Sequence, residues 1–140
     1  MSDSYFLDSN IIVYLFDSSQ ARKQKRAEEL FEQAHESKNG LISIQVVQEF
    51  TNVVTRKFAT PLTFLDLQSF ILTGLRPLCR VHTDVNLLIR ALRIRDSSGY
   101  SFYDALIVAA ALQAGCTRLY SEDLQNGQMI ETLTVVNPFE

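Results

Sequence analysis

Four acidic residues spread along the chain have the chemistry needed to bind divalent metal ions: Asp8, Glu49, Asp104 and Asp123. Carboxylate oxygens are preferred ligands of Mg²⁺ and Mn²⁺, and the lack of histidine and cysteine in this set argues against zinc. Two such ions about 3.5–4 Å apart stabilise both the attacking and the leaving oxygen of a phosphodiester. The residue types therefore indicate metal-dependent hydrolysis with a Mg²⁺ or Mn²⁺ cofactor.

These acids can bind the same metal ions only if the fold brings their side chains close together. Apolar runs alternate with helical patterns along the chain, which is typical of a parallel sheet covered by helices on both faces. We expect strands at residues 5–7, 41–44, 77–82, 117–120 and 133–136. The prediction is a single domain over residues 1–140 with an α/β fold, a three-layer α/β/α sandwich around a central, mainly parallel sheet of about five strands.

Local signals mark several helix ends. Ser18 and Ser19 are suitable N-caps for the helix that follows them, and Ser101 is suitable for the very apolar helix that is expected to end at Gly115. The helix after the second strand is predicted to include Phe58 and to stop before Pro61. A further helix is expected over residues 63–75.

Ligands of open parallel sheets bind at the carboxyl ends of the strands. Asp8 closes the first strand, Asp123 follows the fourth, and Glu49 lies in the helix after the second. The position of Asp104 depends on the orientation of the helix that it begins. Carboxylates crowded at one edge raise one another's pKa values unless cations are bound.

Each acid also has a purely structural interpretation. Asp8 fits an Asx-turn or a helix cap, and Asp123 fits a turn within residues 121–127. Glu49 fits a solvated helix face, and Ser101 with Asp104 matches the S-x-x-D capping box. The shared sheet edge, and no single residue, favours the metal site.

Taken in order, the four acidic segments resemble the PIN-domain family over essentially the whole chain. They are the strand running into Asp8-Ser9-Asn10, the helix from Gln45 to Phe50, the helix from Tyr103 to Leu112, and Leu119 to Asp123. Each segment is weak evidence alone, whereas the ordered set of four is fairly specific.

The resemblance implies a Mg²⁺- or Mn²⁺-dependent nuclease active mainly on RNA, similar to VapC-type toxins that dimerise and are inhibited by a small antitoxin protein. It implies that Asp8, Asp104 and Asp123 are metal ligands and that Glu49 binds metal or orients water. By the same resemblance Asn10 and Ser121 support the site. The chain departs from the commoner pattern at Glu122, which leaves open whether Glu122 or Asp123 faces the metal.

The net charge of −3 is unusual for a protein that binds RNA phosphates. Bound cations would offset the acids, and a basic cluster, Arg22, Lys23, Lys25 and Arg26, is a candidate RNA-binding surface. Alternatively, neighbouring glutamates neutralise this cluster on a solvated helix face. Arg90 and Arg93 form a second, weaker candidate.

Other classes fit less well. A haloacid-dehalogenase-like phosphatase needs an aspartate where Asn10 stands, and a receiver domain needs a lysine near its last strand, whereas Lys57 is the final lysine. Two alternatives stay open: a non-catalytic PIN-like RNA-binding or scaffold module, and a housekeeping RNA-processing nuclease. An antitoxin gene directly upstream would favour the toxin.

The remaining features concern location and assembly. The two cysteines suggest no disulfide framework, and no apolar stretch approaches the length of a membrane span, so we expect a cytoplasmic protein without membrane association. The apolar runs of residues 11–16 and 64–75 exceed what covering a strand requires, which predicts a homodimer.

Overall fold

The computed structural model describes residues 3–56 and 62–140. Its sheet has the strand order β3-β2-β1-β4-β6-β5, and every neighbouring pair is parallel except β5 with β6. The strands are β1 (Tyr5–Leu7), β2 (Gly40–Ser43), β3 (Cys79–Val81), β4 (Arg118–Tyr120), β5 (Met129–Ile130) and β6 (Leu133–Val136). The predicted α/β fold with a mainly parallel central sheet is confirmed.

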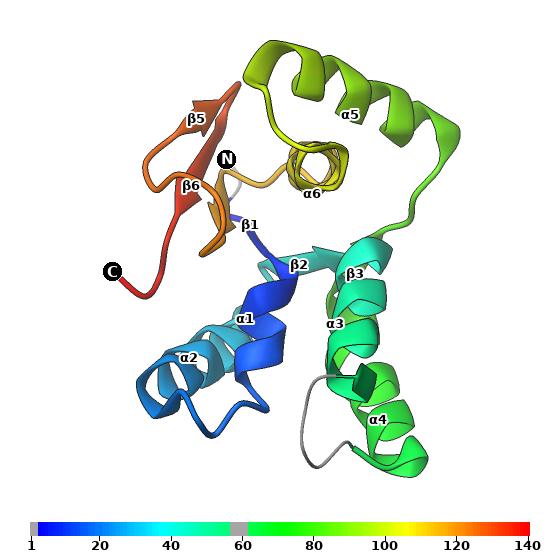
Figure 1. The fold of residues 1–140 in the computed structure, drawn as a ribbon, viewed down its shortest axis with the longest axis vertical. Helices are drawn as coiled ribbons and strands as arrows, with labels where there is room; N and C mark the ends of the chain where they lie inside the picture. Colours follow the sequence, from blue (N-terminus) through cyan, green and yellow to red (C-terminus); the bar gives the residue numbers. More distant parts are fainter. Residues whose placement is uncertain (1–2, 57–61) are drawn as a thin grey trace.

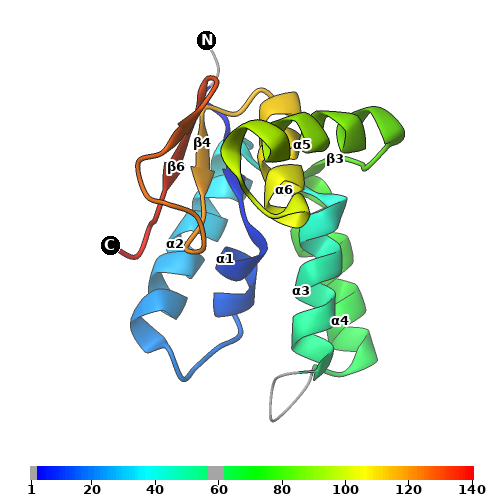
Figure 2. The ribbon, with the colours of Figure 1, turned by 45° about the horizontal axis from the view of Figure 1, so that its top comes forward.

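Helices cover both faces of the sheet (Figures 1 and 2). They are α1 (Ser9–Tyr14), α2 (Ala21–Ser37), α3 (Ile44–Arg56), α4 (Phe64–Phe70), α5 (Val85–Ser98) and α6 (Phe102–Gln113). A π-helical segment (Ile71–Leu75) and a 3-10 turn (Arg76–Leu78) follow α4. Within the described ranges, no helix is long and apolar enough to cross a membrane.

The central helix is α6, which lies between the sheet and α5 (Figure 1). Its residues from Ala105 to Ala111 are all buried. A helix that is apolar on every side must be enclosed by other elements, and here α5 and strands β2, β4 and β6 enclose it. Tight enclosure fixes the first turn of α6, which carries Asp104.

Three local predictions need correction. Neither Ser18 nor Ser19 caps α2, because the cap position is Gln20, without a side-chain bond, and the Ser19 hydroxyl donates to Asp17 instead. The predicted helix of residues 63–75 changes to π-helical geometry at Ile71. Strand β5 was not predicted, since two residues are too few to show an alternating pattern. The predicted helix end at Phe58 and Pro61 lies outside the described residues.

Gly40 sets the distance between the end of α2 and the start of β2. A Cβ atom built on Gly40 would lie 2.2 Å from the Ala34 Cβ and 2.7 Å from the Ala34 Cα. We expect Gly40→Ala to lower the free energy of unfolding by about 1–3 kcal/mol, because a packed core does not yield to an added methyl group. Urea unfolding measures this. Adding Ala34→Gly should restore part of the loss, and wild-type stability of Gly40→Ala alone would contradict the close approach.

Candidate active site

Asp8 lies at the carboxyl end of β1 and begins α1. Its carboxylate accepts hydrogen bonds from the Ser9 backbone N–H and the Ser121 hydroxyl, both at 2.7 Å. The residue is only 6% exposed. Burial raises the pKa of Asp8 to about 7; the bonds from Ser121 and Ser9 oppose this, and the charges of Glu49 and Asp123 add to it. Asp8 therefore lies within electrostatic reach of two other predicted site acids.

Asp123 reaches the same place because β4 pairs directly with β1. The amide of Asn10 donates to the Asp123 carboxylate at 3.0 Å. The buried Ser121 hydroxyl donates to Asp8 and accepts the Asp123 backbone N–H at 3.2 Å. Thus Asn10 and Ser121, predicted as supporting residues, each contact the Asp123 segment and connect it to the Asp8 segment.

Glu49 and the start of α6 are connected through Gln45. The Gln45 amide N–H group donates to the Glu49 carboxylate at 3.3 Å and to the Tyr103 carbonyl at 3.1 Å. Tyr103 precedes Asp104, whose backbone N–H donates to the Ser101 hydroxyl at 3.2 Å, so Ser101 is the predicted cap. Since α6 leads into β4 and runs back across the sheet, its first turn lies at the carboxyl edge.

The structure thus places all four predicted acids at one edge, though not in equal contact. Asp8, Asn10, Ser121 and Asp123 form a connected hydrogen-bond group. Glu49 joins it through charge, and Asp104 lies one residue from the Gln45 contact. Two of the structural interpretations also hold, one of them in part. Asp8 caps α1, and the Ser101 hydroxyl accepts the Asp104 backbone N–H, which is one half of the capping box.

Sequence reasoning missed the roles of Ser43 and Gln45, which are both buried polar residues. Ser43 ends β2, and Gln45 lies in the first turn of α3. The signal that could have found them is the pair of polar residues on either side of Ile44, where the buried strand β2 leads into α3, because buried polar groups usually have hydrogen-bond partners.

The donor chemistry at this edge fits a hard divalent cation. Of the buried side-chain oxygens without a hydrogen-bond partner in the described part of the chain, three belong to segments at this edge, those of Asn10, Ser43 and Gln45. Together with the carboxylates they form an all-oxygen donor set, which suits Mg²⁺ or Mn²⁺. Among the described residues no three His, Cys, Asp or Glu side chains form a ready-made metal cluster. The fit therefore rests on the donor atoms and on the raised pKa of Asp8.

Glu122 points away from this group and contacts helices α1 and α2. Its carboxylate accepts the Tyr14 hydroxyl at 2.6 Å and pairs with the Lys23 ammonium at 2.5 Å. Burial acts to raise the pKa of Glu122, but the bonds from Lys23 and Tyr14 outweigh it and the pKa lies below its usual value. Glu122 thus forms an ion pair with Lys23, whereas Asp123 accepts a hydrogen bond from Asn10 beside Asp8.

The two neighbouring acids can be separated by isosteric amide substitutions. We expect Glu122→Gln to change Mn²⁺ affinity by less than about threefold, because a partly exposed ion pair contributes little and lies apart from Asp8. Asp123→Asn should weaken Mn²⁺ binding by about tenfold or more, as loss of residues that hold or orient metal ligands does. Titration calorimetry measures both, and the reverse order of effects would assign Glu122 to the metal.

The sequence and the structure were both compared with known proteins. The family model of the PIN domain matches residues 5–126. None of the curated proteins compared with the chain is similar enough in sequence to count as a relative. Eleven solved chains are clearly similar in structure, and three of them show how far the likeness extends.

A chain of a toxin–antitoxin complex from Klebsiella pneumoniae is 19% identical with a TM-score of 0.67, and the match covers 98% of this chain and 99% of that one. VapC20 of Mycobacterium tuberculosis, a toxin that cleaves the sarcin–ricin loop, is 22% identical with a TM-score of 0.62, covering 86% and 90%. VapBC2 from Rickettsia felis, bound to a promoter DNA fragment, is 19% identical with a TM-score of 0.61, covering 94% and 96%.

At these identities the structural likeness establishes the fold, and the family model, which spans most of the sequence, establishes the family. The matched region includes Asp8, Glu49, Asp104 and Asp123, the four acids that the fold brings to one sheet edge. The chain belongs to the PIN domain family.

Proposed function

We propose that this PIN domain is a metal-dependent endoribonuclease that hydrolyses RNA phosphodiester bonds, and that it is the toxin of a toxin–antitoxin pair. The observation that carries the proposal is the placement of Asp8, a buried carboxylate whose pKa is raised to about 7 within reach of the charges of Glu49 and Asp123. Such a group is poorly suited to stabilise a fold and well suited to bind a cation.

Each residue of the site has a proposed role. Asp8, Asp104 and Asp123 would hold Mg²⁺ or Mn²⁺, and Glu49 would bind the metal or orient water. A bound divalent ion would supply a more acidic water molecule and neutralise charge on the phosphate. The chain's own bonds fix the ligands in advance: Ser121 orients Asp8, Asn10 orients Asp123, and Gln45 orients Glu49.

The toxin assignment draws on the three structural neighbours, which are a chain of a toxin–antitoxin complex, a toxin that cleaves the sarcin–ricin loop, and a VapBC pair. By analogy we propose a small antitoxin protein as partner and the cytoplasm as the location. A homodimer is also proposed, with one correction to its basis: Ile11 and Ile12 are fully buried and unavailable for contacts between subunits. The exposed apolar side chains of α4 and α5, such as Phe64 and Val85, remain available.

The test is to incubate the purified protein with structured and single-stranded RNAs in Mn²⁺, in Mg²⁺ and in chelator. We expect cleavage that requires metal and stops in chelator. Calorimetric titration with Mn²⁺ on the same sample separates a selective enzyme from an inactive one. An absence of both cleavage and Mn²⁺ binding would favour a non-catalytic RNA-binding module. Light scattering at micromolar concentration tests the dimer, which a monomeric mass would contradict.

A further inference from the structure

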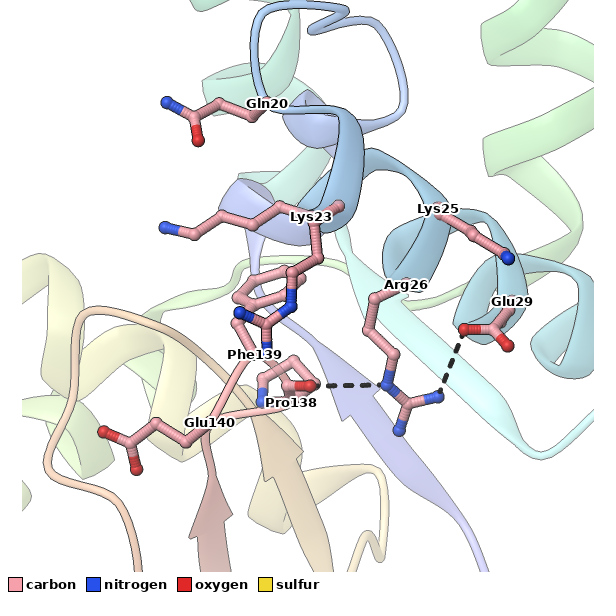
Figure 3. A pocket seen from close by; sticks show the side chains of 9 residues that line it. Gln20, Lys23, Lys25, Arg26, Glu29, Pro138, Phe139 and Glu140 are labelled. Atoms are coloured by element: carbon pink, nitrogen blue, oxygen red, sulfur yellow. Dashed lines mark hydrogen bonds and ion pairs between the residues drawn. The ribbon is translucent and has the colours of Figure 1, made fainter.

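A pocket of about 500 Å³ lies between the start of α2 and residues 138–140 (Figure 3). Its walls include four cationic side chains, Arg22, Lys23, Lys25 and Arg26, against two acidic ones, Glu29 and Glu140. The lining side chains therefore have a net positive charge, whereas the whole chain has a net charge of −3. A local excess of positive charge in a concave site attracts anions.

The acidic side chains of the pocket are already engaged. Glu29 pairs with Arg26 at 4.0 Å, and Glu140 accepts a hydrogen bond from Asn126 at 2.8 Å. In Figure 3 the Glu140 side chain extends away from Arg26. Arg26 also donates to the Pro138 carbonyl at 3.3 Å. Two exposed cations, Arg22 and Lys25, have no ion-pair partner among the described residues.

Helix stability does not explain these cations. The first turn of α2 contains Arg22 and Lys23 and no acid, and Gln20 provides no side-chain cap. Cations at the start of a helix are unfavourable, because the helix dipole places partial positive charge there. Their presence is therefore better explained by an anion that binds in the pocket.

The pocket also has an aromatic wall connected to the candidate active site. The Phe139 ring packs edge to face on Tyr14 with 5.1 Å between centroids, and the Lys23 ammonium lies 5.6 Å from the Phe139 centroid. The same Lys23 pairs with Glu122, the neighbour of Asp123 in the chain. Lys23 thus lines the pocket and contacts the loop that carries a proposed metal ligand.

We propose that this pocket binds a nucleotide of single-stranded RNA that flanks the bond being cut. Arg22 and Lys25 each contact one of its two flanking phosphates, and Phe139 packs against its sugar or base. The combination of backbone-contacting cations with an aromatic surface is how single-stranded nucleic acids are bound without strict sequence dependence. The inference rests on the proposed nuclease function, since it makes the pocket a substrate subsite.

The test measures RNA binding without cleavage. In the Asp8→Asn background with chelator, binding of a short fluorescein-labelled single-stranded RNA is followed by anisotropy as a function of salt. Removing both cations (Arg22→Ala with Lys25→Ala) should weaken binding about 10- to 30-fold at about 0.1 M salt and reduce the slope of log K against log salt by about 1.4, the value for two lost phosphate contacts.

Two further variants make the result specific. Phe139→Leu should weaken binding by about fivefold or more without changing the salt slope, because stacking releases no counterions. Arg90→Ala with Arg93→Ala removes the same charge from α5 and should have a clearly smaller effect. Urea unfolding of each variant shows that it remains folded.

The outcomes separate this inference from the nuclease proposal. Pocket-dependent RNA binding by a protein that neither cleaves RNA nor binds Mn²⁺ would keep the pocket as an RNA-binding site and overturn the nuclease. Equal effects of the α2 and α5 substitutions, or no RNA binding at all, would overturn the subsite whatever the cleavage assay gives. A third outcome would also overturn the subsite. If the Arg22 and Lys25 substitutions weaken binding of poly-glutamate but leave RNA binding unchanged, the pocket binds an acidic polypeptide.

Discussion

Asp8→Asn should abolish metal-dependent RNA cleavage, lowering the rate by at least about 10³-fold while the protein stays folded. The amide is isosteric with the carboxylate but carries no charge, so it is a poor ligand for Mg²⁺ or Mn²⁺. Stabilisation of charge by a catalytic metal contributes several kcal/mol to the transition state, and each 1.4 kcal/mol corresponds to about tenfold in rate. Single-turnover cleavage assays measure the loss.

The fold is expected to tolerate this change. Asp8 is buried, and its neutral form is favoured there, which is why its pKa is raised. A neutral amide can still accept the hydrogen bond from the Ser9 backbone N–H that begins α1. Asp66→Asn, which removes the same charge from the exposed first turn of α4, is the control and should cleave at the wild-type rate. Residual cleavage within tenfold of wild type in Asp8→Asn would exclude Asp8 as an essential metal ligand.

The contribution of Asp8 to the stability of the metal-free protein should fall as the pH rises from 3.8 to about 7, by up to about 4 kcal/mol. The folded state holds the Asp8 proton up to a pKa of about 7, whereas an unfolded aspartate loses it near 3.8. Between these values the folded state binds more protons than the unfolded state, so raising the pH favours unfolding. The Asp8 contribution is fully present below pH 3.8 and is lost above about pH 7.

Urea unfolding in chelator, at intervals from pH 4 to pH 8, measures this effect. Because other carboxylates titrate in the same range, the relevant quantity is the difference between wild type and Asp8→Asn, which lacks the titrating group. The variant should become the more stable of the two as the pH approaches 7. Saturating Mn²⁺, at about 100 times its Kd, should then stabilise wild type by about 2.7 kcal/mol and the variant much less. Parallel pH profiles for the two proteins would show that Asp8 does not titrate abnormally.

Local features of this chain were predictable because their physical causes are local. The alternation of apolar runs with helical patterns predicted β1 and β6 at their observed bounds and the other parallel strands to within a few residues. The cap at Ser101 follows from a side chain three residues from the N–H that it accepts. Strand β5 escaped prediction because it consists of two residues, and the geometry of residues 71–75 depends on packing that no short window contains.

The amino-acid sequence predicts a metal site from four acids in a fixed order, three of them beside a predicted strand or helix end and Glu49 within a helix. How these acids meet depends on the tertiary structure. Asp8 and Ser121 are separated by 113 positions and touch because β1 pairs with β4. In this arrangement Asp8 is buried, which raises its pKa. Asn10 donates a hydrogen bond to Asp123, and Glu122 forms an ion pair with Lys23. Burial and charge proximity are properties of the folded surroundings, so no pattern within one segment could have revealed them.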